Sequence, residues 1–253
     1  TTWQVRRSDF DEMLSDEAVK RGAKKIKGTA VGVLKDPNGA VCGVTVRYPD
    51  GTLGEIHAKV TLDCSGQATF LANQKVTGPK YLGSYDKQVA FFTHVKGAIR
   101  DEGTSGPEAK DNTIILYHQK FHWAWFIPVD HETVSVGLVT PRADFLAKKQ
   151  SPAEFFQSDF YSINPELTRR VPKLDMTEKV HVVPNYSFQV RGFTGPGFAC
   201  IGDSHRFLDP IFSFGVTVTM REAEMIAPVV RDYLQGKSFA QGNPFAAHEI
   251  ICE

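Results

Sequence analysis

The chain has 253 residues, 42% hydrophobic and 23% charged, which is an ordinary composition for a soluble globular protein with a large core in one or two domains. Basic and acidic residues number 29 each, so no net charge favours nucleic acid or an anionic membrane as a partner. No apolar run reaches the roughly 18 residues of a transmembrane helix, and four scattered cysteines without a C-x-x-C pair indicate free thiols in a reducing, cytoplasmic compartment.

A helix and a three-stranded meander are expected first. Ser8 is a good N-cap, and apolar residues then recur at helical spacing as far as Gly22. Asn-Gly and Asp-Gly turns separate the alternating apolar runs that follow, which is a strong hairpin signal. The three strands are expected at about 28–35, 40–48 and 52–58. Residues 59–62 then predict a buried strand that ends at Asp63.

The middle of the chain predicts an antiparallel sheet followed by helices. The strands are expected at 89–94, 113–117, 121–128 and 133–140, with a charged, glycine-rich loop at 101–112 and a turn at 130–132. A capping box at Ser151–Glu154 and a cap at Asn164 start two helices. A long amphipathic helix opens near Gly215, carries apolar residues spaced four and three apart over 216–234, and ends at Gly236.

One predicted strand carries two tryptophans on the same face. At a period of two, the residues that share this face are Phe121, Trp123, Trp125 and Ile127. Two indoles on one strand form a large, stiff apolar wall whose N–H groups need partners. The same pattern is typical of one half of an ordinary β-sheet core, and the residues alone leave both interpretations open.

The most informative stretch of the chain is 207–215, FLDPIFSFG. It follows a buried strand, 198–201, that stops at Gly202-Asp203, and it leads into the long helix. One carboxylate and several free backbone N–H groups therefore meet at a strand-to-helix junction, where anions and cofactor hydroxyl groups are commonly held. An ordinary loop with a capping aspartate would give the same sequence.

Together these two motifs resemble the flavin-dependent halogenase branch of the FAD-dependent monooxygenase superfamily. Its members show W-x-W-x-I-P, here at 123–128, and later F-x-x-P-x-x-S-x-G, here at 207–215. Residues 4–11, QVRRSDFD, resemble the family's Q-V-x-R-x-x-F-D helix start, and residues 62–66, LDCSG, resemble its D-A-S-G strand end. The resemblance therefore covers almost the whole chain.

The glycine-rich turn that holds a dinucleotide pyrophosphate is missing from the sequence, because no G-x-G-x-x-G follows a strand. The resemblance implies that the chain is an internal segment, and that the FAD pyrophosphate unit and the family's catalytic lysine belong to sequence upstream of it. The identity of the catalytic residue is therefore unknown from this chain. We expect the chain by itself to bind FAD weakly or not at all.

The resemblance implies two groups of site residues. On the FAD side they are Gln4, Arg7, Asp63, Gly66, Gly202, Asp203 and Pro210. On the halide and substrate side they are Phe212, Ser213, Phe214, Gly215, Trp123, Trp125 and Pro128. Asp203 would accept a hydrogen bond from a ribityl hydroxyl, with Gln4 and Arg7 converging on the same cleft. A chloride or bromide ion would lie at the helix start beside 213–215, although the same N–H groups could instead bond to flavin or water.

Phe212 stands where tryptophan halogenases carry a glutamate. A phenyl ring cannot polarise a halogenating species, so this departure argues against free tryptophan as a substrate and fits phenol- or pyrrole-type halogenases. The resemblance also gives the indole wall a role: it would keep substrate away from a flavin hydroperoxide while hypohalous acid migrates.

No metal is expected from the sequence. The histidines considered, at 94, 122, 131, 181 and 205, show no ligand spacing with cysteines or carboxylates. His122, on the strand face opposite the tryptophans, and His205, in the flavin-side loop, are expected to be hydrogen-bonded structural residues.

The predicted fold class is mixed α/β: a partial Rossmann-like FAD-binding domain with a β-meander insertion, plus an antiparallel-sheet substrate domain. The divisions are 1–84, 85–194 and 195–253, the last returning to the FAD domain. The implied function is an FAD-dependent, halogenase-like oxidoreductase that acts on an electron-rich aromatic, free or tethered to a carrier protein, with a separate flavin reductase. An aromatic monooxygenase, a geranylgeranyl-reductase-like flavoprotein and a non-catalytic ligand-binding relative remain alternatives.

Overall fold

The computed structural model describes residues 4–82, 87–237, 239 and 242–252. The chain divides into two compact units, one formed by Thr1–Lys25 with Asp86–Tyr186 and the other by Ile26–Tyr85 with Ser187–Glu253. The predicted domain divisions stay a prediction, while the mixture of helices and sheets confirms the α/β class. Within the described residues, no helix combines the length and apolar character needed to cross a membrane.

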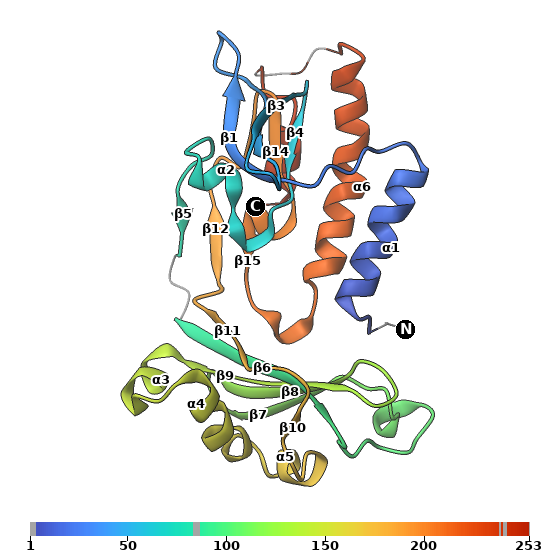
Figure 1. Cartoon of the computed structure of the whole chain (residues 1–253), viewed down its shortest axis with the longest axis vertical. Coiled ribbons are helices and arrows are strands. Elements are labelled where there is room, and N and C mark those ends of the chain that lie inside the picture. Colours follow the sequence, from blue (N-terminus) through green and yellow to red (C-terminus); the bar gives the residue numbers. More distant parts are fainter. Residues whose placement is uncertain (1–3, 83–86, 238, 240–241, 253) are drawn as a thin grey trace. The chain divides into compact units, whose positions relative to one another are not determined.

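The first unit is built on an antiparallel sheet (Figure 1). Its strands, in spatial order, are β10 (Asp175–Met176), β6 (Gln88–Lys96), β9 (Val134–Pro141), β8 (His122–Pro128) and β7 (Ile114–Gln119), and β11 (His181–Pro184) also pairs with β6. The four predicted aromatic-rich strands are confirmed. The turn between β8 and β9 is closed by Asp130, whose carboxylate accepts the N–H groups of Glu132 and Thr133 at 3.0 and 2.8 Å.

Helices cover one face of this sheet (Figure 1). They are α3 (Arg142–Lys148), α4 (Pro152–Asp159) and α5 (Pro165–Arg170), with a short 3₁₀ turn, η3 (Phe160–Ser162), after α4. Phe91 of β6 and Phe155 of α4 are almost fully buried between the two layers. The predicted capping box is confirmed, since Ser151 accepts the Glu154 N–H and the Glu154 carboxylate accepts the Ser151 N–H at 2.8 Å.

The N-terminal helix α1 (Arg7–Lys20) belongs to the same unit and has no buried side chain. The prediction of Ser8 as its N-cap was wrong. Arg6 occupies that position with an extended backbone, and its guanidinium is ion-paired with Asp130 of the β8–β9 turn. Ser8 lies inside the first turn and donates a hydrogen bond to Asp9 at 2.8 Å.

The second unit contains the predicted three-stranded meander. Its strands are β1 (Thr29–Lys35), β2 (Val41–Arg47) and β3 (Leu53–His57), which pair antiparallel in that order. Aspartates close both turns locally. Asp36 accepts the N–H groups of Asn38 and Ala40, each at 2.9 Å, and Asp50 accepts the N–H of Thr52 at 3.0 Å.

Two further small sheets follow the meander. β4 (Thr61–Asp63) pairs in parallel with β14 (Phe198–Cys200), which pairs with β13 (Thr194–Gly195), while β12 (Phe188–Val190) lies between β15 (Arg206–Phe207) and β5 (Lys80–Tyr81). The helical segments are α2 (Phe70–Asn73), α6 (Gly215–Leu234), α7 (Ala246–Cys252) and the 3₁₀ turns η1 (Gly66–Ala68), η4 (Gly202–Ser204) and η5 (Pro210–Phe212). The parallel pairing sets Asp63 opposite Cys200, so the predicted strand ends share one edge.

The buried face of α6 differs from the predicted one. The apolar spacing points to a stripe that includes Met220 and Leu234, but these side chains are 51% and 48% exposed. Glu222 and Ile226 are buried instead, at 5% and 2% exposure. The physical reason is that the Glu222 carboxylate finds hydrogen-bond partners inside the unit, so an ionisable residue occupies a position that a hydrophobic pattern assigns to solvent.

Candidate functional site

Asp63 lies at the end of β4 and is buried, with 4% of its surface exposed. One carboxylate oxygen accepts the N–H of Ser65 at 2.9 Å and the other accepts the N–H of Leu71 at 2.8 Å. Both oxygens therefore hold the segment that follows the strand. Beside it, Gly66 has a φ of +62° with no atom within 4 Å of the position of a Cβ, so its backbone borders open space.

The segment Gly202-Asp203 forms η4 at the end of β14, as the strand-to-turn motif predicts. Gly202 has a φ of +63°, and a Cβ there would lie within 2.9 Å of Thr219 Cγ2 on α6 and closer still to the Thr219 hydroxyl. The residue must be glycine for this turn to pack against the helix. Asp203 is half-buried, and its Oδ1 lies 4.0 Å from the position of a Cβ on Gly215. The fold thus sets the Asp203 carboxylate beside the start of α6, twelve positions further along the chain.

The turn before α6 carries the other predicted residues. Pro210 starts η5, and Ser213 adopts a left-handed backbone with a φ of +54°. The Ser213 N–H donates to the Pro210 carbonyl at 3.0 Å, and no side chain of the described residues caps the N-terminus of α6. Phe212 and Phe214 are 70% and 63% exposed, with stacked rings 5.9 Å apart. This turn therefore presents two aromatic rings and the uncapped start of a helix.

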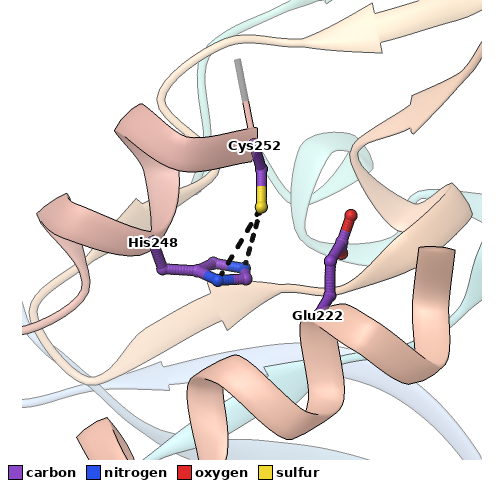
Figure 2. Close-up of side chains that lie close together, drawn as sticks. All are labelled: Glu222, His248 and Cys252. Carbon is purple, nitrogen blue, oxygen red and sulfur yellow. Dashed lines mark hydrogen bonds between the residues drawn. The ribbon is translucent and has the colours of Figure 1, made fainter.

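Two buried side chains, Glu222 and His205, contact the Gly202-Asp203 turn and each other. His205 was considered in the sequence, whereas Glu222 was not. Glu222 of α6 accepts the Gly202 N–H at 2.6 Å, and its Oε2 lies 3.1 Å from Nε2 of His205 (Figure 2 shows Glu222). Burial raises the pKa of Glu222, but the bonds from His205 and Gly202 outweigh it, so its pKa lies below the usual value. The His205 ring stacks on Phe193 with centroids 4.0 Å apart. His205 is hydrogen-bonded, as predicted, whereas the α6 pattern gave no signal for Glu222.

The tryptophan wall lies on the sheet of the first unit. Trp123 and Trp125 share a face, with ring centroids 5.7 Å apart, and Phe92 lies 6.0 Å from Trp125. Their neighbours Ala124 and Phe126 point into the core on the other face. The shared face of the two indoles is confirmed, and it is not the face that packs against the helices. Trp125 Nε1 donates to Ser135 Oγ at 3.2 Å, which supplies the expected N–H partner.

Strand β8 begins one residue later than predicted and ends at Pro128. Phe121 was predicted to lie in the strand, but it has a φ of +65° and precedes β8, so it is not part of the wall. The left-handed conformation breaks the alternation at that point. Pro128 is buried and ends β8 in register with Val134. On the opposite face, His122 Nε2 lies 2.9 Å from Asp144 Oδ2, which confirms a hydrogen-bonded histidine.

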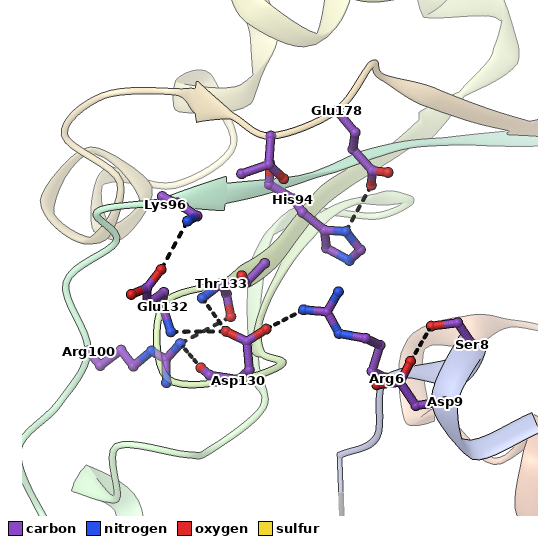
Figure 3. A network of polar contacts seen from close by, with 11 residues as sticks. Arg6, Ser8, Asp9, His94, Lys96, Arg100, Asp130, Glu132, Thr133 and Glu178 are labelled. Atoms are coloured by element: carbon purple, nitrogen blue, oxygen red, sulfur yellow. Dashed lines mark hydrogen bonds and ion pairs between the residues drawn. The ribbon is translucent and has the colours of Figure 1, made fainter. Parts of the chain in front are cut away.

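A polar network surrounds the β8–β9 turn of the same unit (Figure 3). Arg6 pairs with Asp130, and Glu178 lies 2.8 Å from His94 Nδ1 and 3.3 Å from His181 Nε2. Backbone N–H groups of Glu132 and Thr133, followed by the Arg6 guanidinium, hold the pKa of Asp130 well below its usual range. Arg6 occupies the unspecified position of the Q-V-x-R-x-x-F-D motif and Glu178 lies outside the quoted motifs, so neither was singled out from the sequence.

The predicted flavin-side residues of the N-terminus have partners within their own unit. Gln4 Nε2 donates to Thr113 Oγ1 at 2.7 Å, and Arg7 forms a bidentate pair with Asp11 at 2.9 Å. Asp203 belongs to the other unit, so the convergence of Gln4 and Arg7 with it stays a prediction.

Comparison with known proteins decides the family. The sequence model described as tryptophan halogenase matches residues 1–237, which is nearly the whole chain. The chain belongs to the tryptophan halogenase family. Members of this family that resemble it include the 1H-pyrrole-2-carbonyl-[peptidyl-carrier protein] brominase of Pseudoalteromonas luteoviolacea, 35% identical over 98% of the chain and 59% of that protein. The tryptophan 2-halogenase of Chondromyces crocatus is 30% identical over 93% of the chain and 45% of its own length.

Solved structures of halogenases share the fold. The flavin-dependent brominase Bmp2 superposes with a TM-score of 0.89 at 36% identity, covering 98% of the chain and 60% of that protein. The chondrochloren halogenase CndH, at 24% identity, shares the fold with a TM-score of 0.84. The chain thus spans 59% of the brominase that it matches at 35% identity.

Proposed function

We propose that the chain forms the ribityl-side and substrate-side part of a flavin-dependent halogenase that acts on an electron-rich pyrrole or phenol. The observation that carries the proposal is the meeting of Asp203 with the start of α6, where Oδ1 lies 4.0 Å from the Cβ position of Gly215. Gly215 belongs to the F-x-x-P-x-x-S-x-G motif of the halogenase branch, and the resemblance assigns Asp203 to a ribityl hydroxyl. Two relatives are named as a brominase and a chlorinase of carrier-bound pyrrole-2-carbonyl groups.

The residues present fit FAD on this side of the second unit. The backbone of Gly66 borders open space, and the atom nearest to a Cβ position on Gly215 belongs to Asp203. Because glycine has no side chain, a ligand can approach the backbone closely at both positions. Asp203 is the carboxylate that we assign to a ribityl hydroxyl, because it lies in the turn at the end of β14 beside the start of α6. Both oxygens of Asp63 bond to backbone N–H groups. Asp63 would then act by shaping the turn that carries Gly66. FAD, when bound, supplies the oxidation of the halide.

The start of α6 is the proposed halide position. The Ser213 N–H already donates to Pro210, which leaves the N–H groups of Phe214 and Gly215 as the proposed donors. They lie at the positive end of a 20-residue helix, where a chloride or bromide ion is favoured. The stacked rings of Phe212 and Phe214 would exclude water on one side of the ion.

The substrate proposal rests on Phe212 and the indole wall. Phe212 stands where tryptophan halogenases carry a glutamate, so an activated ring such as pyrrole or phenol fits better than free tryptophan. The role that the resemblance gives Trp123 and Trp125 is to separate this ring from the flavin. Within the first unit their face is not the one that packs against the helices. A carrier protein that tethers the substrate, a separate flavin reductase and a cytoplasmic location complete the proposal.

The test uses the complete natural protein that contains residues 1–253, supplied with FAD, a flavin reductase, NADH and bromide or chloride. Pyrrole-2-carbonyl on a carrier protein and a panel of free phenols and pyrroles serve as substrates, and mass spectrometry detects the halogen isotope pattern. We expect a halogenated product. Replacing Ser213 with leucine should reduce its yield by crowding the ion.

A matched pair of variants tests the wall. Trp125→Ala should increase hydroxylated product or uncoupled peroxide, whereas Trp125→Phe keeps an aromatic barrier and should stay near wild type. Hydroxylated or reduced product alone from the wild-type protein, at every halide concentration and for every substrate, would replace the proposal by a monooxygenase or reductase function.

A further inference from the structure

A cluster of three metal-ligand side chains, Glu222, His248 and Cys252, lies in the second unit (Figure 2). Glu222 comes from α6, and His248 and Cys252 come from α7. One possible ligand atom of each lies within 4.8 Å of the other two. Glu222 and His248 are 5% and 3% exposed, and Cys252 is half-buried.

The two residues of α7 have a spacing that suits a shared ligand. His248 and Cys252 are four positions apart, so their side chains lie on the same face of the helix. Cys252 Sγ lies 3.8 Å from His248 Nδ1 and 3.9 Å from Nε2. Zinc ligands in proteins are thiolate sulfur, imidazole nitrogen and carboxylate oxygen, and the cluster contains one of each.

Other contacts hold α7 in place without using the three ligand atoms. The Glu249 carboxylate accepts the Phe193 N–H at 3.2 Å and bonds to the hydroxyl of Thr194. Arg206 Nη1 donates to the Cys252 carbonyl at 2.9 Å. The cluster is therefore assembled by the fold.

The surroundings of His248 leave its ring available to a cation. The side chain is 3% exposed, and a neutral imidazole nitrogen has a lone pair that a metal can use. Among the described residues, the Cys252 thiol, a weak hydrogen-bond donor, lies within hydrogen-bond distance of the His248 ring nitrogens. Glu222 stays ionised, and its bonds to Gly202 and His205 would orient a ligating carboxylate.

We propose that Glu222, His248 and Cys252 bind one zinc ion that ties α7 to α6. The thiolate makes zinc a better match than magnesium or calcium, which prefer oxygen ligands. Zinc displaces the thiol proton of Cys252 to solvent and forms bonds to Sγ, one imidazole nitrogen of His248 and a carboxylate oxygen of Glu222, with water completing the tetrahedral set. Its role is structural: it braces the helix behind Gly202 and His205. The expectation of no metal did not consider His248.

The experiment measures zinc and cobalt(II) binding to the metal-free protein. We expect one equivalent of zinc in competition with a chromophoric chelator, and a thiolate-to-cobalt charge-transfer band when cobalt(II) is added. Cys252→Ser should abolish the band, and both Cys252→Ser and His248→Gln should weaken zinc binding by at least about 10-fold. Cys64→Ser is the matched control, because Cys64 is an exposed thiol of the same unit that lies outside the cluster.

Stability gives a second measurement. Zinc should raise the melting temperature of wild type and of Cys64→Ser but not that of Cys252→Ser. Circular dichroism confirms that each variant is folded before metal is added. Failure of the wild-type protein to bind an equivalent of zinc, or binding that is the same in Cys252→Ser and His248→Gln as in wild type, would overturn the proposal. Either result is distinct from failure of the halogenase proposal, because metal binding and melting temperature are measured without halide, flavin or substrate.

Discussion

Replacing Gly137 with alanine tests the position of the tryptophan wall. Gly137 of β9 is the cross-strand partner of Trp125, and the indole of Trp125 lies over it. A Cβ on Gly137 would be 2.5 Å from Cη2 and 2.6 Å from Cε2 of that indole, and closer still to Cζ2. Such separations are far below van der Waals contact, so Trp125 has to move.

The expected cost follows from three effects. Overpacking at a well-filled site costs about 1–3 kcal/mol. Displacing the indole breaks the 3.2 Å hydrogen bond from Trp125 Nε1 to Ser135 Oγ, which contributes about 0.5–1.5 kcal/mol. Replacing a glycine by alanine reduces the conformational entropy of the unfolded chain, which stabilises the folded protein by about 0.4–1 kcal/mol. We therefore expect Gly137→Ala to lower the free energy of unfolding by about 0.5–4 kcal/mol.

Urea unfolding followed by tryptophan fluorescence and circular dichroism measures this change. Gly32→Ala is the matched control, since Gly32 also lies in a strand but a Cβ there would be 3.3 Å from its nearest neighbour, Thr45 Oγ1. Because Thr45 has to shift by only a few tenths of an ångström, the change in unfolding free energy of this control should be much smaller than that of Gly137→Ala. Ser135→Ala isolates the hydrogen bond. A Gly137→Ala variant with wild-type stability and unchanged tryptophan emission would refute the placement of the indole over Gly137.

Three further expectations concern other parts of the two units. The pKa of Asp130 is held low by backbone N–H groups of its own turn and then by Arg6, so its contribution to stability is present above its unfolded pKa of about 3.9 and is lost as pH falls toward the folded value. Asp130→Asn should flatten the pH dependence of urea unfolding in that acid range. Arg170→Met removes the partner that bonds both Asp101 oxygens at 3.0 Å and leaves Arg169 at 3.8 Å. Because this second cation remains and the Asp101 side chain is 19% exposed, the loss in unfolding free energy should be about 1–3 kcal/mol, and replacing Asp101 with leucine as well should largely recover it. Gly202→Ala combines a φ of +63° with a clash against α6, so it should cost more than about 1–2 kcal/mol in thermal or urea unfolding and weaken FAD binding by the complete protein.

Elements whose signals are local were predicted well from the sequence. The meander strands are set by turns in which Asp36 and Asp50 accept backbone N–H groups two to four residues ahead. The start of α4 is set in the same way by Ser151 and Glu154. Each signal needs only a few adjacent residues, so the sequence contains all of it.

The errors occur where a distant partner decides the local structure. The N-cap of α1 moved from Ser8 to Arg6, which pairs with Asp130, more than a hundred residues away in the chain. Phe121 left the strand because the β7–β8 turn needs a left-handed residue there, which alternation of apolar residues does not reveal. No pattern within the segment itself signals such partners.

The Gly202-Asp203 turn was recognised in the sequence, but the buried residue that holds it was not. Gly202-Asp203 could be recognised because a strand end, a glycine and a carboxylate are adjacent. The residue that fixes this turn, Glu222, comes twenty positions later on a helix whose apolar spacing assigns it to solvent. Its carboxylate binds the Gly202 N–H and His205, so it fixes the backbone from which Asp203 projects. A motif search therefore finds the exposed half of the site, and burial of an ionisable group in the folded structure is needed to find the half that supports it.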